Sequence, residues 1–178
     1  KKGREISQAI GYIAEGLFRD QAEIDNSPSQ EGDVKPGDIR YRDLNNDGKI
    51  DVNDVTYIGF PETPRVTYGF SGFVNYSNFE FSFAFQGSGK RSFFMDPSEL
   101  SPFVDDHAML TAIYKDHWSE DNMIRKPFWP RLSTQNLIEH SPEEDWYNKN
   151  ATEVRKSTYF MRECRFLRCT SLELAYNM

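Results

Sequence analysis

The chain has 178 residues, a formal net charge of −7 and a sequence pI near 5.0, and aromatic residues make up 15% of it. The acidic balance argues against nucleic acid as a partner, because proteins that bind phosphate backbones need clustered Lys and Arg. No apolar run reaches the roughly 20 residues of a membrane helix, and a mean hydropathy of −0.71 suits either a soluble domain or an outer-membrane barrel with large polar loops.

We expect the chain to be one part of a longer polypeptide. It opens on KKGREISQAIGY, without a start Met or a signal peptide, and it stops at LELAYNM, within a predicted strand. Residues 1–178 are therefore interpreted as part of a larger fold.

The first predicted elements are a strand and a polar loop. Residues 10–18 (IGYIAEGLF) form a short apolar segment that favours a strand. Residues 19–37 combine Asn, Ser, Pro and Gly, which is typical of a loop.

A calcium-binding loop is predicted within residues 33–60. Oxygen-bearing side chains recur at the spacing of a twelve-residue calcium loop, with Gly48 at the position where the chain must turn sharply. The residues at its ligand positions are Asp43, Asn45, Asp47, Lys49, Asp51 and Asp54. Ile50 is expected to anchor the loop in a core. We expect the Ca²⁺ to be structural, because a sensor would need paired loops and a Met-rich groove.

The loop also has a simpler interpretation. The last ligand position holds Asp54 rather than the usual Glu, which favours a weak site. The alternative is an Asn-Asp-Gly turn with solvated acids, although its four carboxylates, offset only by Lys49, repel one another when no cation is present.

An antiparallel hairpin is predicted over residues 64–87. In its second half, one face carries Phe79, Phe81, Phe83 and Phe85, and the other carries Glu80, Ser82, Ala84 and Gln86. The first half repeats this alternation, with Phe73 as the exception, and Ser77 and Asn78 form the turn. A soluble hairpin would bury the aromatic face against a second sheet. A membrane barrel would turn that face to lipid and the polar face to the lumen.

Residues 88–157 are predicted to be a long loop rich in Pro, Trp and charge. One short helix is expected within residues 106–118, with Asp105 or Asp106 as its N-cap. Residues 119–133 should be extended, because Pro127 and Pro130 interrupt them. The aromatic residues of this loop (Trp118, Phe128, Trp129 and Trp146) could stack on a sugar or peptide, although such residues more often pack loops together.

Residues 158–178 return to a strand pattern. Leu172, Leu174 and Tyr176 alternate with polar or small residues. On a continuous strand, Cys164 and Cys169 would lie on opposite faces and beyond disulfide reach, so we expect free thiols.

Motifs for enzymatic chemistry are incomplete. The stretch Gly87–Lys90 lacks the first Gly and the final Ser or Thr of a phosphate-binding loop, so its glycines are expected to release the chain from the strand. The histidines (His107, His117 and His140) have no zinc-ligand companion at close spacing. No isolated pair of carboxylates stands out, as a glycosidase would require. We therefore expect no enzymatic activity.

Four stretches together resemble a known family. Residues 10–25 (IGYIAEGLFRDQAEID), 37–89 (from GDIRYRDLNNDGKID to FEFSFAFQGSG), 117–133 (HWSEDNMIRKPFWPRLS) and 157–176 (STYFMRECRFLRCTSLELAY) resemble, in the same order, the C-terminal barrel region of SusC/RagA-type TonB-dependent outer-membrane transporters. Cys164, Cys169 and Ala175 depart from the family's usual residues, which affects local packing rather than the order of the motifs.

The resemblance implies an all-β fold, part of a large transmembrane antiparallel β-barrel of about 22 strands with long extracellular loops. It implies import of oligosaccharide or peptide cargo across the cell outer membrane. The implied partners are a SusD-like surface lipoprotein and TonB, the latter through parts of the protein outside this chain. Residues 75–78 would make a periplasmic turn, and residues 33–60 and 88–157 would be extracellular. Tyr68, Phe70 and the aromatic residues of 79–85 would contact outer-membrane lipid.

Two other functional classes are alternatives. A soluble calcium-dependent carbohydrate- or protein-binding β module would bury the aromatic face of residues 79–85 under a second sheet. A carbohydrate-active enzyme would need paired carboxylates in a cleft.

Overall fold

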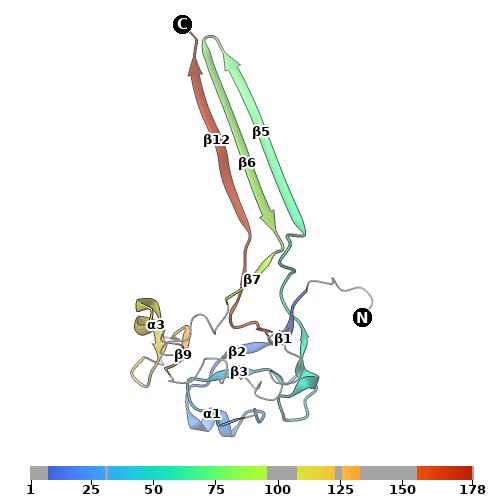
Figure 1. The fold of residues 1–178 in the computed structure, drawn as a ribbon, viewed down its shortest axis with the longest axis vertical. Helices are drawn as coiled ribbons and strands as arrows, with labels where there is room; N and C mark the ends of the chain where they lie inside the picture. The colour runs from blue at the N-terminus through green and yellow to red at the C-terminus, as the bar shows by residue number, and fades with distance from the viewer. Residues whose placement is uncertain (1–7, 31, 96–107, 123–125, 133–155, 178) are drawn as a thin grey trace. The chain divides into compact units, whose positions relative to one another are not determined.

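The computed structural model describes residues 8–30, 32–95, 108–122, 126–132 and 156–177. The chain divides into two compact units (Figure 1). The long-sheet unit comprises residues 1–9, 59–93 and 162–178, and the core unit comprises residues 10–58 and 94–161. Across the described ranges, no helix combines the length and the apolar character needed to cross a membrane.

The long-sheet unit is built on three antiparallel strands of 11 residues each: β5 (Val66–Tyr76), β6 (Phe79–Gly89) and β12 (Phe166–Tyr176). The central strand is β6, with β5 and β12 on its two sides (Figure 1). Tyr76 pairs with Phe79 across the two-residue turn, in which Ser77 has a left-handed φ of 54°. A bulge between Cys169 and Ser171 interrupts the pairing of β12 with β6.

Short strands make up the core unit. β1 (Ile10–Tyr12) pairs in parallel with β10 (Lys156–Ser157) and antiparallel with β4 (Thr56–Tyr57). β2 (Ala14–Leu17) pairs antiparallel with β3 (Ile39–Tyr41), and β8 (His117–Trp118) runs parallel to β9 (Trp129–Arg131). A further two-stranded sheet of β7 (Ser92–Phe94) and β11 (Met161–Glu163) belongs mostly to the long-sheet unit, which includes residues 92–93 and 162–163.

The helices within the described residues are short. They are α1 (Gln21–Asp25), the 3-10 helix η1 (Val52–Asp54) and α3 (Thr111–Asp116). The expectation of an all-β fold is confirmed, because strands carry most of the regular structure among the described residues. A hydrophobic core in the core unit contains Tyr12, Ile39, Tyr41, Ile50 and Phe160, each at most 3% exposed. Ile50 anchors the 43–54 loop in that core, as the sequence predicts.

Several local expectations are wrong. Residues 10–18 form two strands in different sheets rather than one, and the predicted loop at residues 19–37 contains α1. The helix α3 begins after Leu110, which makes no side-chain cap. Asp105 and Asp106 lie outside the described residues, as do residues 133–155. Gly87 and Gly89 pair within β6 and do not release the chain from it. Close neighbours exclude a side chain at Gly87, whereas a Cβ at Gly89 would meet nothing within 4 Å.

Candidate functional site

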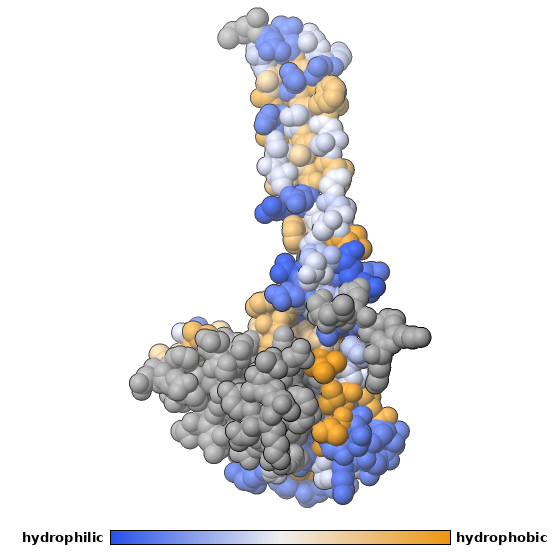
Figure 2. Space-filling view, turned by 45° about the vertical axis from the view of Figure 1, so that its right-hand side comes forward, coloured by the Kyte–Doolittle hydropathy of each residue, from blue (hydrophilic) through white to orange (hydrophobic). Residues whose placement is uncertain are grey.

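The long sheet has one apolar face. The register brings together aromatic and aliphatic side chains from all three strands on this face: Val66, Tyr68, Phe70, Val74 and Tyr76 from β5, Phe79, Phe81, Phe83 and Phe85 from β6, and Leu167, Leu172, Leu174 and Tyr176 from β12. Tyr76 is 79% exposed and Leu174 is 72% exposed. Figure 2 shows hydrophobic side chains along the surface of this sheet. Among the described residues, no second sheet covers this apolar face.

Rings on the apolar face contact one another along the sheet. Phe70 stacks on Phe85 with ring centroids 5.0 Å apart, and Phe79 lies 5.0 Å from Tyr176 on the other side of β6. Glycines provide room for two of the rings. A Cβ at Gly72 would lie 2.8 Å from the Phe83 ring, and one at Gly87 would lie 2.4 Å from the Tyr68 ring. The apolar face is therefore a continuous, packed layer of side chains.

The opposite face is small and polar. It carries Thr67, Gly69, Ser71 and Asn75 from β5, Glu80, Ser82, Ala84, Gln86 and Ser88 from β6, and Arg168, Ser171, Glu173 and Ala175 from β12. Phe73 and Phe166 are the aromatic residues on this face, and Arg168 lies over the Phe166 ring, 5.9 Å from its centroid. Eleven residues per strand match the roughly 9–11 residues with which a tilted strand crosses a bilayer.

The predicted calcium loop is held by its own side chains. Asp43 accepts hydrogen bonds from the backbone N–H groups of Asn46 (2.6 Å) and Gly48 (2.8 Å). Asn45 accepts from the N–H of Asp47, and Asp47 accepts from the N–H of Lys49, both at 2.9 Å. Gly48 makes the sharp turn with a left-handed φ of 81°. The loop therefore turns where the spacing predicts.

The remaining predicted ligands have a different local role. Asp51 and Asp54 form the capping box of η1. Asp54 is fully buried, and its two carboxylate oxygens accept from the N–H groups of Leu44 (2.7 Å) and Asp51 (2.9 Å). Within the described part of the chain, no group of three or more His, Cys, Asp or Glu side chains gathers as a metal site. The carboxylate and amide oxygens of Asp43, Asn45 and Asp47 are nevertheless donors of the kind that Ca²⁺ prefers.

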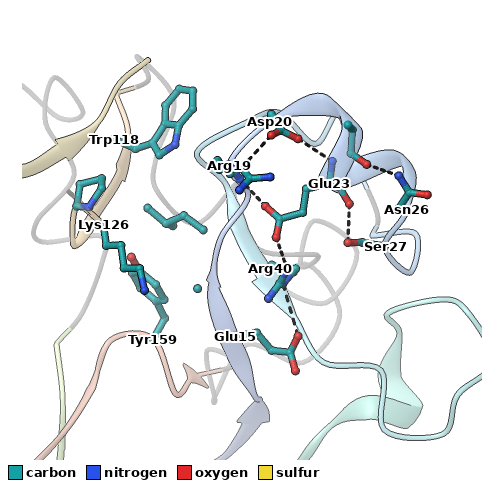
Figure 3. Close-up of a pocket in the computed structure, with 14 residues that line it drawn as sticks. Glu15, Arg19, Asp20, Glu23, Asn26, Ser27, Arg40, Trp118, Lys126 and Tyr159 are labelled. Atoms are coloured by element: carbon teal, nitrogen blue, oxygen red, sulfur yellow. Dashed lines mark hydrogen bonds and ion pairs between the residues drawn. The ribbon is translucent and has the colours of Figure 1, made fainter. Parts of the chain in front are cut away.

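A cleft of about 760 Å³ lies in the core unit. Figure 3 shows Trp118, Lys126 and Tyr159 on one side of it and Arg19, Asp20, Glu23 and Arg40 on the other. The residues of this cleft come from segments far apart in the sequence. Sequence reasoning did not find it, because no motif or spacing joins such segments.

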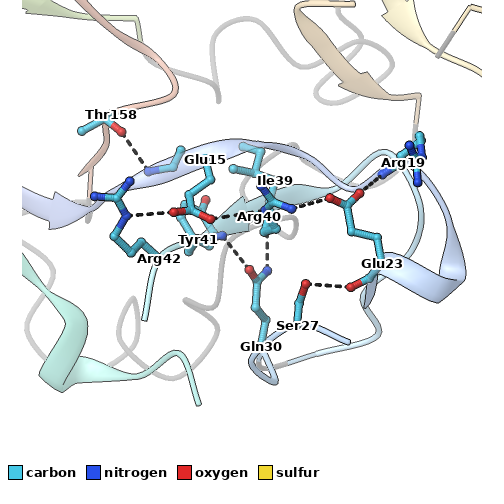
Figure 4. Close-up of polar contacts among 11 residues, drawn as sticks. Glu15, Arg19, Glu23, Ser27, Gln30, Ile39, Arg40, Tyr41, Arg42 and Thr158 are labelled. Atoms are coloured by element: carbon cyan, nitrogen blue, oxygen red, sulfur yellow. Dashed lines mark hydrogen bonds and ion pairs between the residues drawn. The ribbon is translucent and has the colours of Figure 1, made fainter. Parts of the chain in front are cut away.

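Ion pairs order the polar wall of the cleft (Figure 4). Glu15 contacts Arg42 at 2.8 Å and Arg40 at 3.5 Å. Arg40 also pairs with Glu23, which accepts a hydrogen bond from the backbone N–H of Arg19 at 2.7 Å. Each of these charged groups is thereby held by a neighbour of opposite charge or by a backbone donor.

Asp20 caps α1 at the rim of this wall. Its Oδ1 accepts from the N–H of Glu23 at 2.9 Å, and its Oδ2 contacts Arg19 Nε at 2.9 Å. The hydrogen bond from Glu23 and then that from Arg19 hold the pKa of the Asp20 carboxyl below its usual value. The hydrogen bond and charge of Asp20 in turn raise the pKa of Arg19. Both groups are therefore ionised at neutral pH.

The fold and these surfaces define an all-β chain whose longest sheet has one apolar and one polar face, the pattern of strands that separate lipid from water. The chain is similar to TonB-dependent receptor P26 of Formosa agariphila, with 26% identity over 184 aligned residues that cover 99% of this chain. It is also similar to TonB-dependent receptor P3 of the same organism, with 32% identity over 88 residues, or 49% of this chain. No protein-family model matches.

Both similarities support the TonB-dependent receptor family, which is the broader part of the resemblance seen in the sequence. The aligned regions cover 16% of the length of P26 and 9% of that of P3. Activity, cargo and partners, which belong to whole receptors, are therefore treated as proposals.

Proposed function

We propose that this chain forms part of the transmembrane barrel of a SusC/RagA-type TonB-dependent transporter in the outer membrane. The observation that carries the proposal is the exposed apolar face of three 11-residue strands, with a small polar face behind it. An apolar face of this size is costly in water and stable against hydrocarbon. The similarity to two TonB-dependent receptors supports the same assignment.

The transporter would import oligosaccharide or peptide cargo and would not be an enzyme. The two-residue turn at Ser77 and Asn78 would lie on the periplasmic side, because periplasmic turns are short and outer loops are long. Residues 33–60 and 88–157 would then be extracellular, near a SusD-like lipoprotein. TonB would supply energy through parts of the protein outside this chain.

We further propose that the loop from Asp43 to Asp54 binds a structural Ca²⁺. Its support is the spacing of the oxygen donors around Gly48. Asp43, Asn45 and Asp47 would supply ligands, because their side chains lie in one turn and carboxylate oxygens have further lone pairs. Lys49 and Asp51 would contribute at most their backbone or water-mediated contacts, and buried Asp54 would brace the loop from within.

Cysteine labelling of adjacent residues tests the barrel. In a background with Cys164→Ser and Cys169→Ser, we expect Ser82→Cys to react with a water-soluble maleimide in intact outer membranes. Phe83→Cys should react only after the protein is unfolded in detergent, because its side chain lies on the apolar face. Equal labelling of both variants in a protein that fractionates as soluble would overturn the proposal in favour of a soluble calcium-dependent binding module.

Calorimetry tests the ion site. We expect heat from Ca²⁺ binding to the native protein that is lost in Asp43→Ala and in Asp47→Ala. Asp33→Ala is the matched control, because Asp33 is an exposed acid that pairs with Lys35 and lies outside the loop from Asp43 to Asp54. Equal heats in all four proteins would remove calcium from the proposal.

A further inference from the structure

The cleft in the core unit has the chemistry of a saccharide site. Its lining includes three carboxylates (Glu15, Asp20 and Glu23) and three cations (Arg19, Arg40 and Lys126), so its formal charges cancel. A charged ligand would compete with the ion pairs that Arg19 makes with Asp20 and that Arg40 makes with Glu15 and Glu23. A neutral ligand that carries hydroxyl groups can instead add hydrogen bonds to the unused lone pairs and N–H groups.

Two rigid aromatic side chains complete the cleft. Trp118 packs so closely on Gly37 that a Cβ there would lie 2.6 Å from the indole ring, and Gly37 has a left-handed φ of 92°. The Tyr159 ring stacks on Phe128 at 5.4 Å with an interplanar angle of 7°, and its hydroxyl donates to the Phe128 carbonyl. Aromatic groups fixed in this way bind a ligand at little cost in conformational entropy.

Trp118 also provides a hydrogen-bond donor. Its Nε1 is buried and finds no acceptor among the described residues, and a buried N–H without an acceptor is costly. A ligand hydroxyl in the cleft would accept from it. Trp118 thus combines an apolar ring with one polar group, the combination that suits a sugar ring with its C–H face and hydroxyl rim.

We propose that this cleft binds a neutral oligosaccharide, with Trp118 and Tyr159 against the sugar rings and the paired charges of Arg19, Arg40, Asp20 and Glu23 against the hydroxyls. This inference deepens the proposed transport function. That the bound oligosaccharide is cargo rests on the proposed function.

The test is titration calorimetry on the whole protein, purified from the cells that produce it. The probes are maltohexaose, cellohexaose and mannohexaose, with hexagalacturonic acid and a Gly-Ser hexapeptide for comparison. We expect at least one neutral hexasaccharide to bind, with Trp118→Ala weakening its Kd at least about tenfold through loss of ring contact and hydrogen bond. Tyr114→Ala, which truncates a 63% exposed aromatic residue on the nearby α3, should leave the Kd unchanged.

Trp118→Phe keeps a ring on Gly37 but removes the indole N–H, and we expect it to weaken binding a few-fold. Should Trp118→Ala fail to fold by circular dichroism, this variant decides the question. Failure of all neutral probes to bind, preference for the charged or peptide probe, or an unchanged Kd in the deciding Trp118 variant would overturn the inference. The cysteine labelling at Ser82 and Phe83 tests the long sheet, whereas calorimetry tests the cleft. The transport proposal and the saccharide-binding proposal can therefore fail independently of one another.

Discussion

The hydroxyl group of Tyr68 on β5 donates a 3.1 Å hydrogen bond to the backbone carbonyl of Phe166 on β12, across the intervening strand β6. The Tyr68 ring lies over Gly87, the residue of β6 with which it pairs. A Cβ at Gly87 would be 2.4 Å from this ring and 2.6 Å from the Phe166 carbonyl oxygen. One glycine thus lets a single tyrosine connect the two outer strands of the sheet.

Gly87→Ala should therefore loosen the sheet. We expect a destabilisation of about 1–3 kcal/mol, typical of an extra methyl group in a packed site, and loss of the Tyr68 hydrogen bond. Urea-dependent unfolding in detergent micelles measures the change. Gly89→Ala is the matched control two residues along the same strand, where a Cβ meets nothing within 4 Å. Equal midpoints for the two variants would contradict this account of Gly87.

A charge on the apolar face should prevent membrane folding if that face contacts lipid. Leu172 is 66% exposed and pairs with Phe83 near the middle of the sheet. We expect Leu172→Arg to cost about 2–4 kcal/mol at the bilayer midplane, measured as a smaller fraction of heat-modifiable, folded protein on gels after refolding into lipid vesicles. The adjacent Glu173→Arg lies on the polar face and should fold normally. The reverse ranking would exclude lipid contact on this side.

The sequence predicts the long hairpin well because its information is local. The alternation of Phe79, Phe81, Phe83 and Phe85 determines the face of every neighbour, and the Ser77–Asn78 turn sets the register. The pairing of β12 with β6 could not be predicted, because nothing near Leu172 in the sequence specifies a partner as distant as Phe83. No sequence pattern predicts the bulge after Cys169 either. Both cysteines are free thiols, as expected.

The helix α1 and the cleft were missed for a different reason. Five residues are too few for helical periodicity, and the surrounding Asn, Ser and Pro favour a loop. The available signal was Asp20 followed three residues later by Glu23, a spacing that predicts an N-cap. The cleft depends on the distance between Arg40 and Trp118 in space, which only tertiary packing determines.

The stability of α1 should depend on pH through Asp20. Because the pKa of this carboxyl is lower in the folded state, its contribution is present above the unfolded pKa near 4 and is lost as the pH falls through the lower folded value. We expect amide exchange at Glu23, corrected for its intrinsic pH dependence, to show less protection below about pH 4. Asp20→Asn keeps a capping oxygen but loses the charge beside Arg19, so its protection should vary less with pH. An identical pH profile in that variant would contradict the role of the charge.

Asp38 should be one of the charged residues on which the core unit depends. It is 3% exposed, its Oδ1 contacts Arg131 Nε at 2.7 Å, and its Oδ2 accepts from the N–H of Lys35 at 2.8 Å. Asp38→Ala would leave the guanidinium of Arg131 without this carboxylate, and we expect a loss of about 3 kcal/mol, the low end for a broken buried pair, because that side chain is still 23% exposed.

The exposed pair of Asp33 and Lys35 supplies the comparison for Asp38. Its side chains are 83% and 54% exposed, so Asp33→Ala should change stability by less than about 0.5 kcal/mol. Proteolysis of the core unit at increasing urea concentration measures both variants by the same cleavage products. Both ion pairs have the same 2.7 Å separation. Water weakens the exposed pair of Asp33 and Lys35 but has little access to the pair of Asp38 and Arg131, so the urea midpoints of the two variants should differ. Coincident midpoints would mean that burial adds nothing to the contact of Asp38 with Arg131.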